Sequence, residues 1–145
     1  MITGNGFKAL DEWERKLTRI SAPLERAAGL AARDFRKEIS KSFDEKRDPY
    51  GTRWKKRKGY YKHPILQETR TMRRGWRVLQ RGPGKTEIVF MNVDPKHIYH
   101  QYGTESIDVR AQAPDKRGLP PKYKAILKMH AVSELSRELN RSIGG

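Results

Sequence analysis

Two of the four histidines in this chain are spaced for a shared role. His97 and His100 are three residues apart on a short predicted helix. This spacing places both imidazoles on one face, where they could bind a metal ion with Asp94 or Glu105 as a third ligand. Two histidines fall short of the usual tetrahedral set, and the alternative is that both rings pack or hydrogen-bond among the neighbouring tyrosines. The sequence therefore assigns no metal ligand.

No other arrangement of residues indicates catalysis. The segment Gly82-Pro83-Gly84-Lys85 differs from the phosphate-binding glycine loops, and Pro83 lacks the amide donor that such a loop needs, so it predicts a hairpin turn. No Ser/His/Asp arrangement is recognisable, because such partners can lie far apart in sequence. The absence of cysteine excludes disulfides and thiolate metal sites. We therefore expect a protein that is not an enzyme, with no catalytic residue and no cofactor.

Basic segments are the most distinctive chemistry of the chain. The 145 residues carry a formal net charge of +15, which attracts polyanions such as nucleic acid or acidic protein surfaces. Arginine and lysine beside aromatic residues can bind phosphates and stack on bases, and the alternative is a solvated face or ion pairs with an acidic partner chain. No sequence-reading motif is present. The candidate contact residues are Lys55, Lys56, Arg57, Lys58, Arg73, Arg74 and Arg77.

Helical periodicity dominates the first third of the chain. The apolar spacing predicts one helix from Phe7 to Ile20 and a second that begins at Ser21 and Pro23, as an N-cap and first turn, and runs to about Glu45. The stripe of the first helix is Leu10, Trp13, Leu17 and Ile20. The stripe of the second is Leu24, Ala28, Ala31, Phe35, Ile39 and Phe43.

The middle of the chain predicts a short helix over 65–74 and then a β-hairpin, with strands over 75–81 and 86–92. Apolar residues occur on both faces of the second strand, a pattern typical of a strand that is covered on both sides. In a domain of this size another subunit can supply one cover. The candidate interface residues are Ile88, Val89, Phe90 and Met91.

A short helix is expected from Asp94 to Tyr102, ended by Gly103. Residues 104–121 indicate an extended or mobile loop, with a strand at 107–110 as an option. Two interpretations of 122–128 remain open, a strand or the start of one helix at Pro120-Pro121. A helical stripe follows, formed by Val132, Leu135, Leu139 and Ile143.

These elements predict an α+β fold with long N-terminal helices, a small, mostly antiparallel sheet with a central hairpin, and a C-terminal helix. We expect a single domain, 1–145, made of a helical part (1–46), a basic loop (47–64), a sheet region (65–128, with the loop 104–121) and a C-terminal helix (129–145). No apolar run is long enough to cross a membrane. The N-terminus lacks the layout of a signal peptide, so we expect use without export.

Three segments together resemble the phage virion-morphogenesis and tail-completion family, which includes the G protein of phage Mu. They are the D-P-x-G-x-x-W turn at 48–54, the segment 65–75 that leads into the hairpin, and the I-H-Q-Y-G-like segment 98–103, which has an inserted tyrosine. Arg70 stands where the family often has glycine. The residues that carry the resemblance are Asp48, Pro49, Gly51, Trp54, Leu66, Thr69, His100, Gln101, Tyr102 and Gly103.

The resemblance implies a structural protein of the virion neck or tail, present in the host cytoplasm before assembly, whose motif residues support the fold. Its implied partners are other copies of itself in a ring, with a hexamer matching tail symmetry, together with tail-tube and head-connector proteins and DNA in the channel. No membrane is implied. The role as terminator, stopper or completion protein stays open, as does whether the charge faces DNA or acidic partners. The alternative is a basic nucleic-acid-binding module that is not part of a particle.

Overall fold

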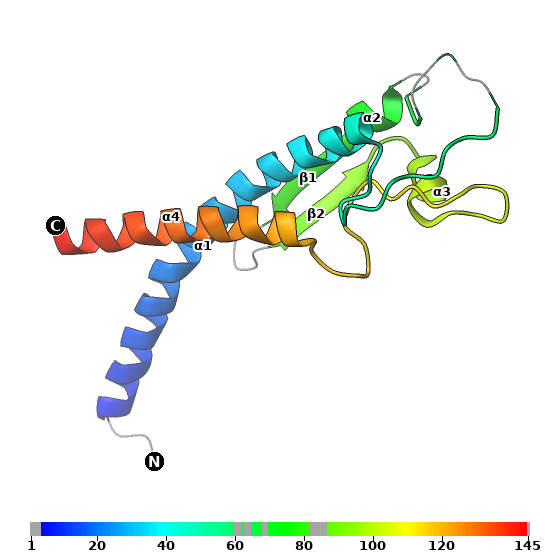
Figure 1. The fold of residues 1–145 in the computed structure, drawn as a ribbon. Coiled ribbons are helices and arrows are strands. Elements are labelled where there is room, and N and C mark those ends of the chain that lie inside the picture. Colours follow the sequence, from blue (N-terminus) through cyan, green and yellow to red (C-terminus); the bar gives the residue numbers. More distant parts are fainter. Residues whose placement is uncertain (1–3, 60–61, 63–64, 68–69, 82–86, 145) are drawn as a thin grey trace.

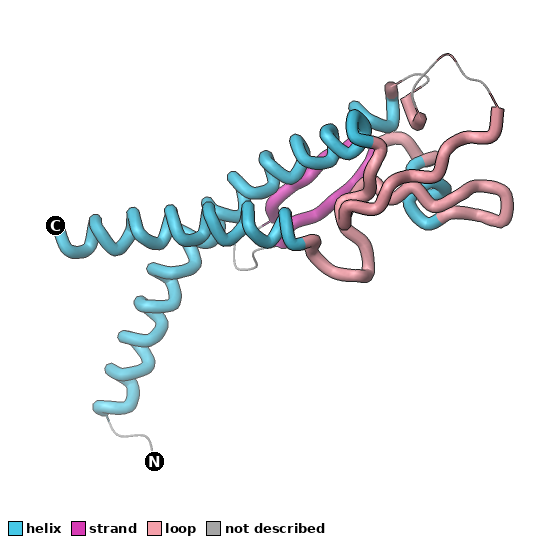
Figure 2. The backbone as a smooth tube through the Cα atoms, in the orientation of Figure 1, coloured by secondary structure: helices cyan, strands magenta, loops and turns pink. Residues whose placement is uncertain are grey.

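The computed structural model describes residues 4–59, 62, 65–67, 70–81 and 87–144. Figures 1 and 2 show two long helices packed beside a small sheet, with loops and short helices at one end. The predicted α+β class is confirmed. The elements are α1 (Gly4–Glu45), α2 (Thr71–Gly75), β1 (Trp76–Arg81), β2 (Glu87–Asn92), α3 (His97–Tyr102) and α4 (Pro121–Gly144).

α1 is one continuous helix, so the predicted boundary at Ser21 is wrong. Pro23 lies inside the helix, where its ring removes one backbone hydrogen bond and crowds the preceding turn. Figure 1 shows α1 bending between its dark-blue N-terminal part and its lighter middle part, and Pro23 is the physical cause that the sequence offers. The ring of Pro23 is fully buried, so packing offsets part of this cost.

β1 and β2 pair antiparallel, with Val78 opposite Phe90. The face that carries these two residues packs on α1, where the ring of Phe35 stacks on Phe90 with centroids 5.9 Å apart. The predicted strands are confirmed, and side chains alternate along β1: Trp76 and Val78 are buried while Arg77 and Leu79 are exposed. Within the described residues the sheet has two strands, and the optional strand at 107–110 does not form.

The core lies where α1, the sheet and the start of α4 meet. The predicted stripe in the second half of α1 is confirmed from Ala28 to Phe43, whose side chains are buried. Tyr123 inserts from α4, with its ring 4.8 Å from that of Phe35. Since α4 begins at Pro121, the helical alternative for 122–128 is the correct one, and proline at a first helical position fits it.

The segment before β1 is less helical than predicted. Among the described residues of 65–74, namely 65–67 and 70–74, the helix begins at Thr71. Leu66 and Arg70 adopt left-handed backbone conformations, with φ of 62° and 58°, which no α-helix accommodates. The predicted turn at 82–84 lies outside the described residues.

One segment of the 104–120 loop, residues 110–113, is buried against the rest of the fold. Ala111, Gln112 and Ala113 are buried in it. Gln101 of α3 holds this loop, because its Oε1 accepts hydrogen bonds from the N–H groups of Gln112 and Ala113 and its Nε2 donates to the carbonyl of Ala113. The sequence predicted an extended or mobile loop, and its composition gave no sign of this backbone pairing.

Candidate interaction surfaces

The D-P-Y-G turn forms as predicted and is closed by Asp48. Its Oδ1 accepts hydrogen bonds from the N–H groups of Tyr50 (2.9 Å) and Thr52 (2.8 Å). Gly51 lies at φ 93°, a conformation that favours glycine, and its N–H donates to the carbonyl of Asp48 at 3.1 Å. Trp54 is buried beyond the turn, where its Nε1 donates to the carbonyl of Ala111 at 2.9 Å. These motif residues therefore stabilise the fold.

A second turn at 115–118 clasps this motif, and sequence reasoning missed it. The Tyr50 hydroxyl donates to the carbonyl of Gly118 and accepts from the N–H of Asp115. The Arg117 guanidinium lies 3.8 Å from the centroid of the Tyr50 ring and pairs with Asp115 at 2.8 Å. Hydrogen bonds from Arg117 lower the pKa of Asp115 to about 2. The Asp-x-x-Gly pattern at 115–118 is the sequence signal that could have indicated this turn.

The second and third motif segments also have structural roles. Arg70 adopts the left-handed conformation at the position where the family pattern has glycine. Gly103 ends α3 at φ 76°, and an added Cβ would lie 2.8 Å from Val109. Tyr102 is exposed, whereas Gln101 is buried. Thr69 lies outside the described residues.

The two spaced histidines are used separately. His97 Nδ1 lies 2.7 Å from the Asp94 carbonyl oxygen, and its ring contacts Trp76 edge-on. Burial, followed by the charge of Arg110, lowers the pKa of His100. Its Nδ1 is buried without a hydrogen-bond partner. Within the described residues no three metal-capable side chains come together.

The seven basic candidates differ in how much the fold already uses them, and Lys55, for example, pairs with Asp108 at 3.3 Å. Arg73 is built in, because its guanidinium donates two hydrogen bonds to Asp44 (2.6 and 2.9 Å) and others to Ser40 and Gln67. Arg74 and Arg77 are exposed. The candidates in the basic loop lie in an irregular segment beside Trp54, where Lys56 and Arg57 line a hollow of about 590 Å³.

Charge is strongly segregated along the chain. The segment 46–74 holds eleven Lys and Arg against two Asp and Glu, a net charge of +9. α1 holds nine against eight, a net charge of +1. In Figure 1 the described residues of 46–74 lie at the end of the molecule opposite the N- and C-termini of the chain. The most basic part of the molecule is therefore distinct from the end where α1 and α4 diverge.

The sheet presents one free face. Ile88 and Phe90 pack against the core cluster, so these two candidate interface residues are occupied within the chain. Val89 and Met91 point the other way, beside Leu79 and Arg77 of β1. Leu79 and Met91 are exposed. Of the four candidates, Val89 and Met91 remain available to another subunit.

The helical end exposes more apolar surface than the sheet. Figures 1 and 2 show the N-terminal part of α1 and the C-terminal part of α4 diverging beyond the sheet. Both predicted stripes are exposed here, and the exposed fraction of each described residue lies between 37% and 76%. They consist of Leu10, Leu17 and Ile20 on α1, and of Val132, Leu135, Leu139 and Ile143 on α4.

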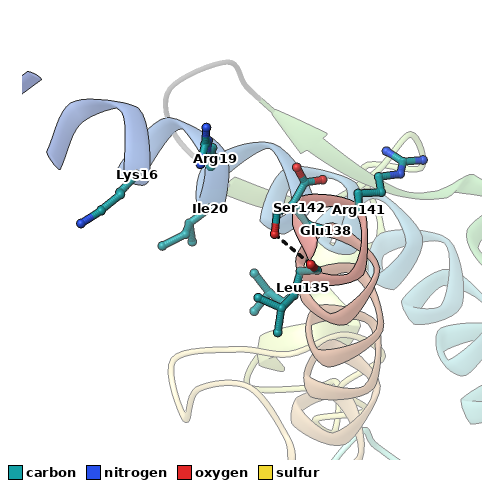
Figure 3. A pocket seen from close by; sticks show the side chains of 8 residues that line it. Lys16, Arg19, Ile20, Leu135, Glu138, Arg141 and Ser142 are labelled. Carbon is teal, nitrogen blue, oxygen red and sulfur yellow. Dashed lines mark hydrogen bonds between the residues drawn. The ribbon is translucent and has the colours of Figure 1, made fainter. Parts of the chain in front are cut away.

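A groove of about 630 Å³ lies between the two diverging helices (Figure 3). Its apolar lining comes from Ile20 of α1 and from Leu135 and Leu139 of α4. The remaining lining residues are polar or charged, namely Lys16, Arg19, Glu138, Arg141 and Ser142. Glu138 pairs weakly with Arg26, at 3.4 Å. Sequence reasoning found both stripes without saying what covers them, because periodicity cannot distinguish an interior face from an interface.

No family model, no curated protein and no solved structure matches this chain. The function is therefore inferred from the surfaces described above. In the described part of the chain, none of the helices has the length and apolar character that crossing a bilayer requires.

Proposed function

We propose that this chain is a structural, non-enzymatic subunit of a tailed-phage particle, which assembles with its own copies into a ring at the neck or tail end. The observation that carries the proposal is the pair of uncovered apolar stripes on the diverging ends of α1 and α4. Contiguous exposed apolar surface on a protein with so much charge is typical of an interaction site.

The resemblance in the three motif segments supports the phage assignment. In the turn at 48–51 and in the Gln101–Gly103 segment, the motif residues each have a conformational role. Arg70 departs from the pattern, but it adopts the left-handed conformation that the glycine of the pattern would favour. Their roles are structural, as expected for a protein that works through shape and surface. The role within the neck, as terminator or completion protein, depends on which rings it contacts.

The charge supports a place among polyanionic neighbours. Six copies at +15 each would carry a formal charge of +90, and like charges held close together repel. Acidic partner rings or DNA in the channel would offset this charge, and the basic segment 46–74 is the surface available to them. Tail-tube and head-connector proteins are the partners we propose.

Electron microscopy of the purified protein tests the proposal. Closed rings of uniform diameter are expected, because a head-to-tail contact that closes by rotation gives a ring. Open filaments or dispersed monomers would count against it. In particles that contain the chain, the ring is expected at the junction of head and tail.

The segregated charge favours one second candidate, a basic nucleic-acid-binding module that is not part of a particle. This function predicts duplex binding that weakens steeply with salt. Reversing the charges of Lys55, Lys56, Arg57 and Lys58 to Glu is then expected to abolish binding, while reversing Lys124 and Lys128 on α4 leaves most of it. Duplex binding by a protein that never assembles would favour this module over the ring subunit.

A further inference from the structure

α4 changes character along its length. Its first two turns are held by the core, since Tyr123 is buried there and Ile126 and Leu127 pack against the core cluster. Beyond these turns, the one buried residue of this fully described helix is Glu134, whose side chain is 3% exposed. An α-helix turns by about 100° per residue, so Glu134 lies on the same side of α4 as Tyr123, and Leu139 lies on the other side. The second half of α4 therefore directs a carboxylate toward α1 and leaves its apolar stripe uncovered.

Polar contacts join this second half of α4 to α1. The Glu134 carboxylate accepts a hydrogen bond from Nε of Arg26 on α1, at 3.1 Å. Nη2 of the same arginine lies 3.4 Å from a carboxylate oxygen of Glu138. One turn before Glu134, His130 Nε2 lies 2.7 Å from Oδ2 of Asp34 on α1. The attachment of this half therefore depends on charged side chains, whereas the first half also places an aromatic ring in the core.

Ionic contacts at a partly open interface respond to the solvent in a way that apolar packing does not. The side chain of Arg26 is 46% exposed, so dissolved ions reach it and compete with its carboxylate partners. When Arg26 dissociates, Glu134 keeps a cation from its own helix, Arg137 at 3.2 Å, but loses the one from α1. A carboxylate that stays buried with part of its compensating charge removed is costly. Movement of this half of α4 into water relieves that cost.

Such a movement leaves the core intact. Figure 1 shows the C-terminal part of α4 extending beyond the sheet. The ring of Tyr123, 4.8 Å from that of Phe35, keeps the start of the helix attached to the core. Segments that bury few apolar side chains open at a lower free energy than the core does. The second half of α4 can therefore open while the rest of the domain stays folded.

We propose that residues 129–144 form an arm that an ionic latch, Arg26 with Glu134 and Glu138, holds on α1. The arm opens when salt or a competing charged group weakens the latch, while residues 121–127 stay docked. Opening carries the apolar stripe of α4 away from α1, so the groove between the two helices exists in the closed state alone. The latch operates within a single chain and does not require ring formation.

Amide hydrogen exchange of the full-length protein, measured by the mass of its peptides, follows both halves of α4 in the same molecule. Arg26→Glu places a negative charge opposite the two carboxylates and should speed exchange in 129–144 by at least about tenfold, while 121–127 keeps its rate. The effect is visible because a released helix of this length is marginally stable in water. Lys128→Glu is the matched control, since it makes the same charge change at an exposed position of α4. All proteins are compared at a dilution at which they have the same mass in solution, so self-assembly does not contribute.

Glu134→Leu distinguishes a latch from a fixed structural ion pair. Leucine at this buried position docks through apolar contact, so exchange in 129–144 should slow and lose its dependence on salt. In the unmodified protein, exchange in this segment should become faster between about 0.05 M and about 1 M salt.

Three results would overturn the latch. The first is equal exchange in Arg26→Glu and Lys128→Glu. The second is an arm that opens as readily in Glu134→Leu as in Arg26→Glu. The third is faster exchange in both halves of α4 together, because the arm would then open only with the whole domain.

Discussion

The side-chain amide of Gln101 makes two hydrogen bonds with the backbone of Ala113. Oε1 accepts from the Ala113 N–H at 3.2 Å, and Nε2 donates to the Ala113 carbonyl at 2.7 Å. A third bond, from the N–H of Gln112 at 2.8 Å, completes the clamp. It joins α3 to a loop segment that is buried but belongs to no strand, so a single side chain takes the place of a strand partner.

Gln101→Leu should lower the free energy of unfolding by about 2–4 kcal/mol, because it leaves two N–H groups and one carbonyl buried without partners. Urea denaturation checks this value. Tyr102→Leu is the neighbouring control and should change stability by less than about 0.5 kcal/mol, since Tyr102 is exposed. Equal stability of the two variants would show that the clamp contributes nothing.

Arg73→Ala should destabilise the fold by about 1–3 kcal/mol, since it removes a bidentate ion pair with Asp44 and leaves Ser40 and Gln67 without this donor. Arg74→Ala should stay within about 0.5 kcal/mol of the unmodified protein, because Arg74 is exposed. Thermal unfolding of both variants measures the difference. If Arg73→Ala were as stable as the unmodified protein, Arg73 would again be a candidate for contact with a partner.

Phe90→Ala should cost about 2–4 kcal/mol of stability, because its ring contacts Phe35 and Tyr123 in the core. Met91→Ala, one position along β2 and exposed on the outer face, should cost less than about 1 kcal/mol. Denaturation curves for the isolated chain measure both. If Met91→Ala were as costly as Phe90→Ala, the outer face would not be free for another subunit.

The pH dependence of the stability of Asp115→Asn tests the contact between the turns at 48–51 and 115–118. Hydrogen bonds from Arg117 lower the pKa of Asp115 from its ordinary 3.8 to about 2 in the folded state. Because the pKa is lower in the folded state than in the unfolded state, the ionised Asp115 stabilises the fold at any pH above its unfolded-state pKa. This contribution is lost as the pH falls through the folded-state pKa of about 2. At pH 7 the substitution should cost about 1–2 kcal/mol after allowance for solvent screening.

The stability difference between Asp115→Asn and the unmodified protein should shrink as the pH is lowered from 4 to 2, as measured by urea unfolding at each pH. Asp108→Asn, which removes an exposed carboxylate paired with Lys55, serves as the control. A difference that is independent of pH would mean that the charge of Asp115 contributes nothing to the clasp.

Local signals predicted much of the fold. The stripe from Ala28 to Phe43, the antiparallel pair of β1 and β2 and the turn at 48–51 each depend on residues close in sequence, and all three are present. Pro23 misled the helix assignment, because the same residue begins a helix at its first position and bends a helix in its interior. Tertiary packing distinguishes the two outcomes, and no local pattern carries that information.

The long-range features were beyond the reach of sequence. The Gln101 clamp joins residues 11 and 12 positions apart through backbone atoms that any residue type provides. The clasp of Tyr50 joins residues 65 and 68 positions apart. Periodicity detected the stripes of Leu10 and Leu139, but their exposure depends on how far α1 and α4 diverge, so the groove emerged only with the structure.

The mass of the purified full-length protein, measured at low and at high salt, tests the proposed function most directly. Salt screens the repulsion between copies that each carry +15. A discrete ring-sized oligomer should therefore be present at high salt, and the fraction of protein in this oligomer should be lower at low salt. A strict monomer at both salt concentrations would contradict the account.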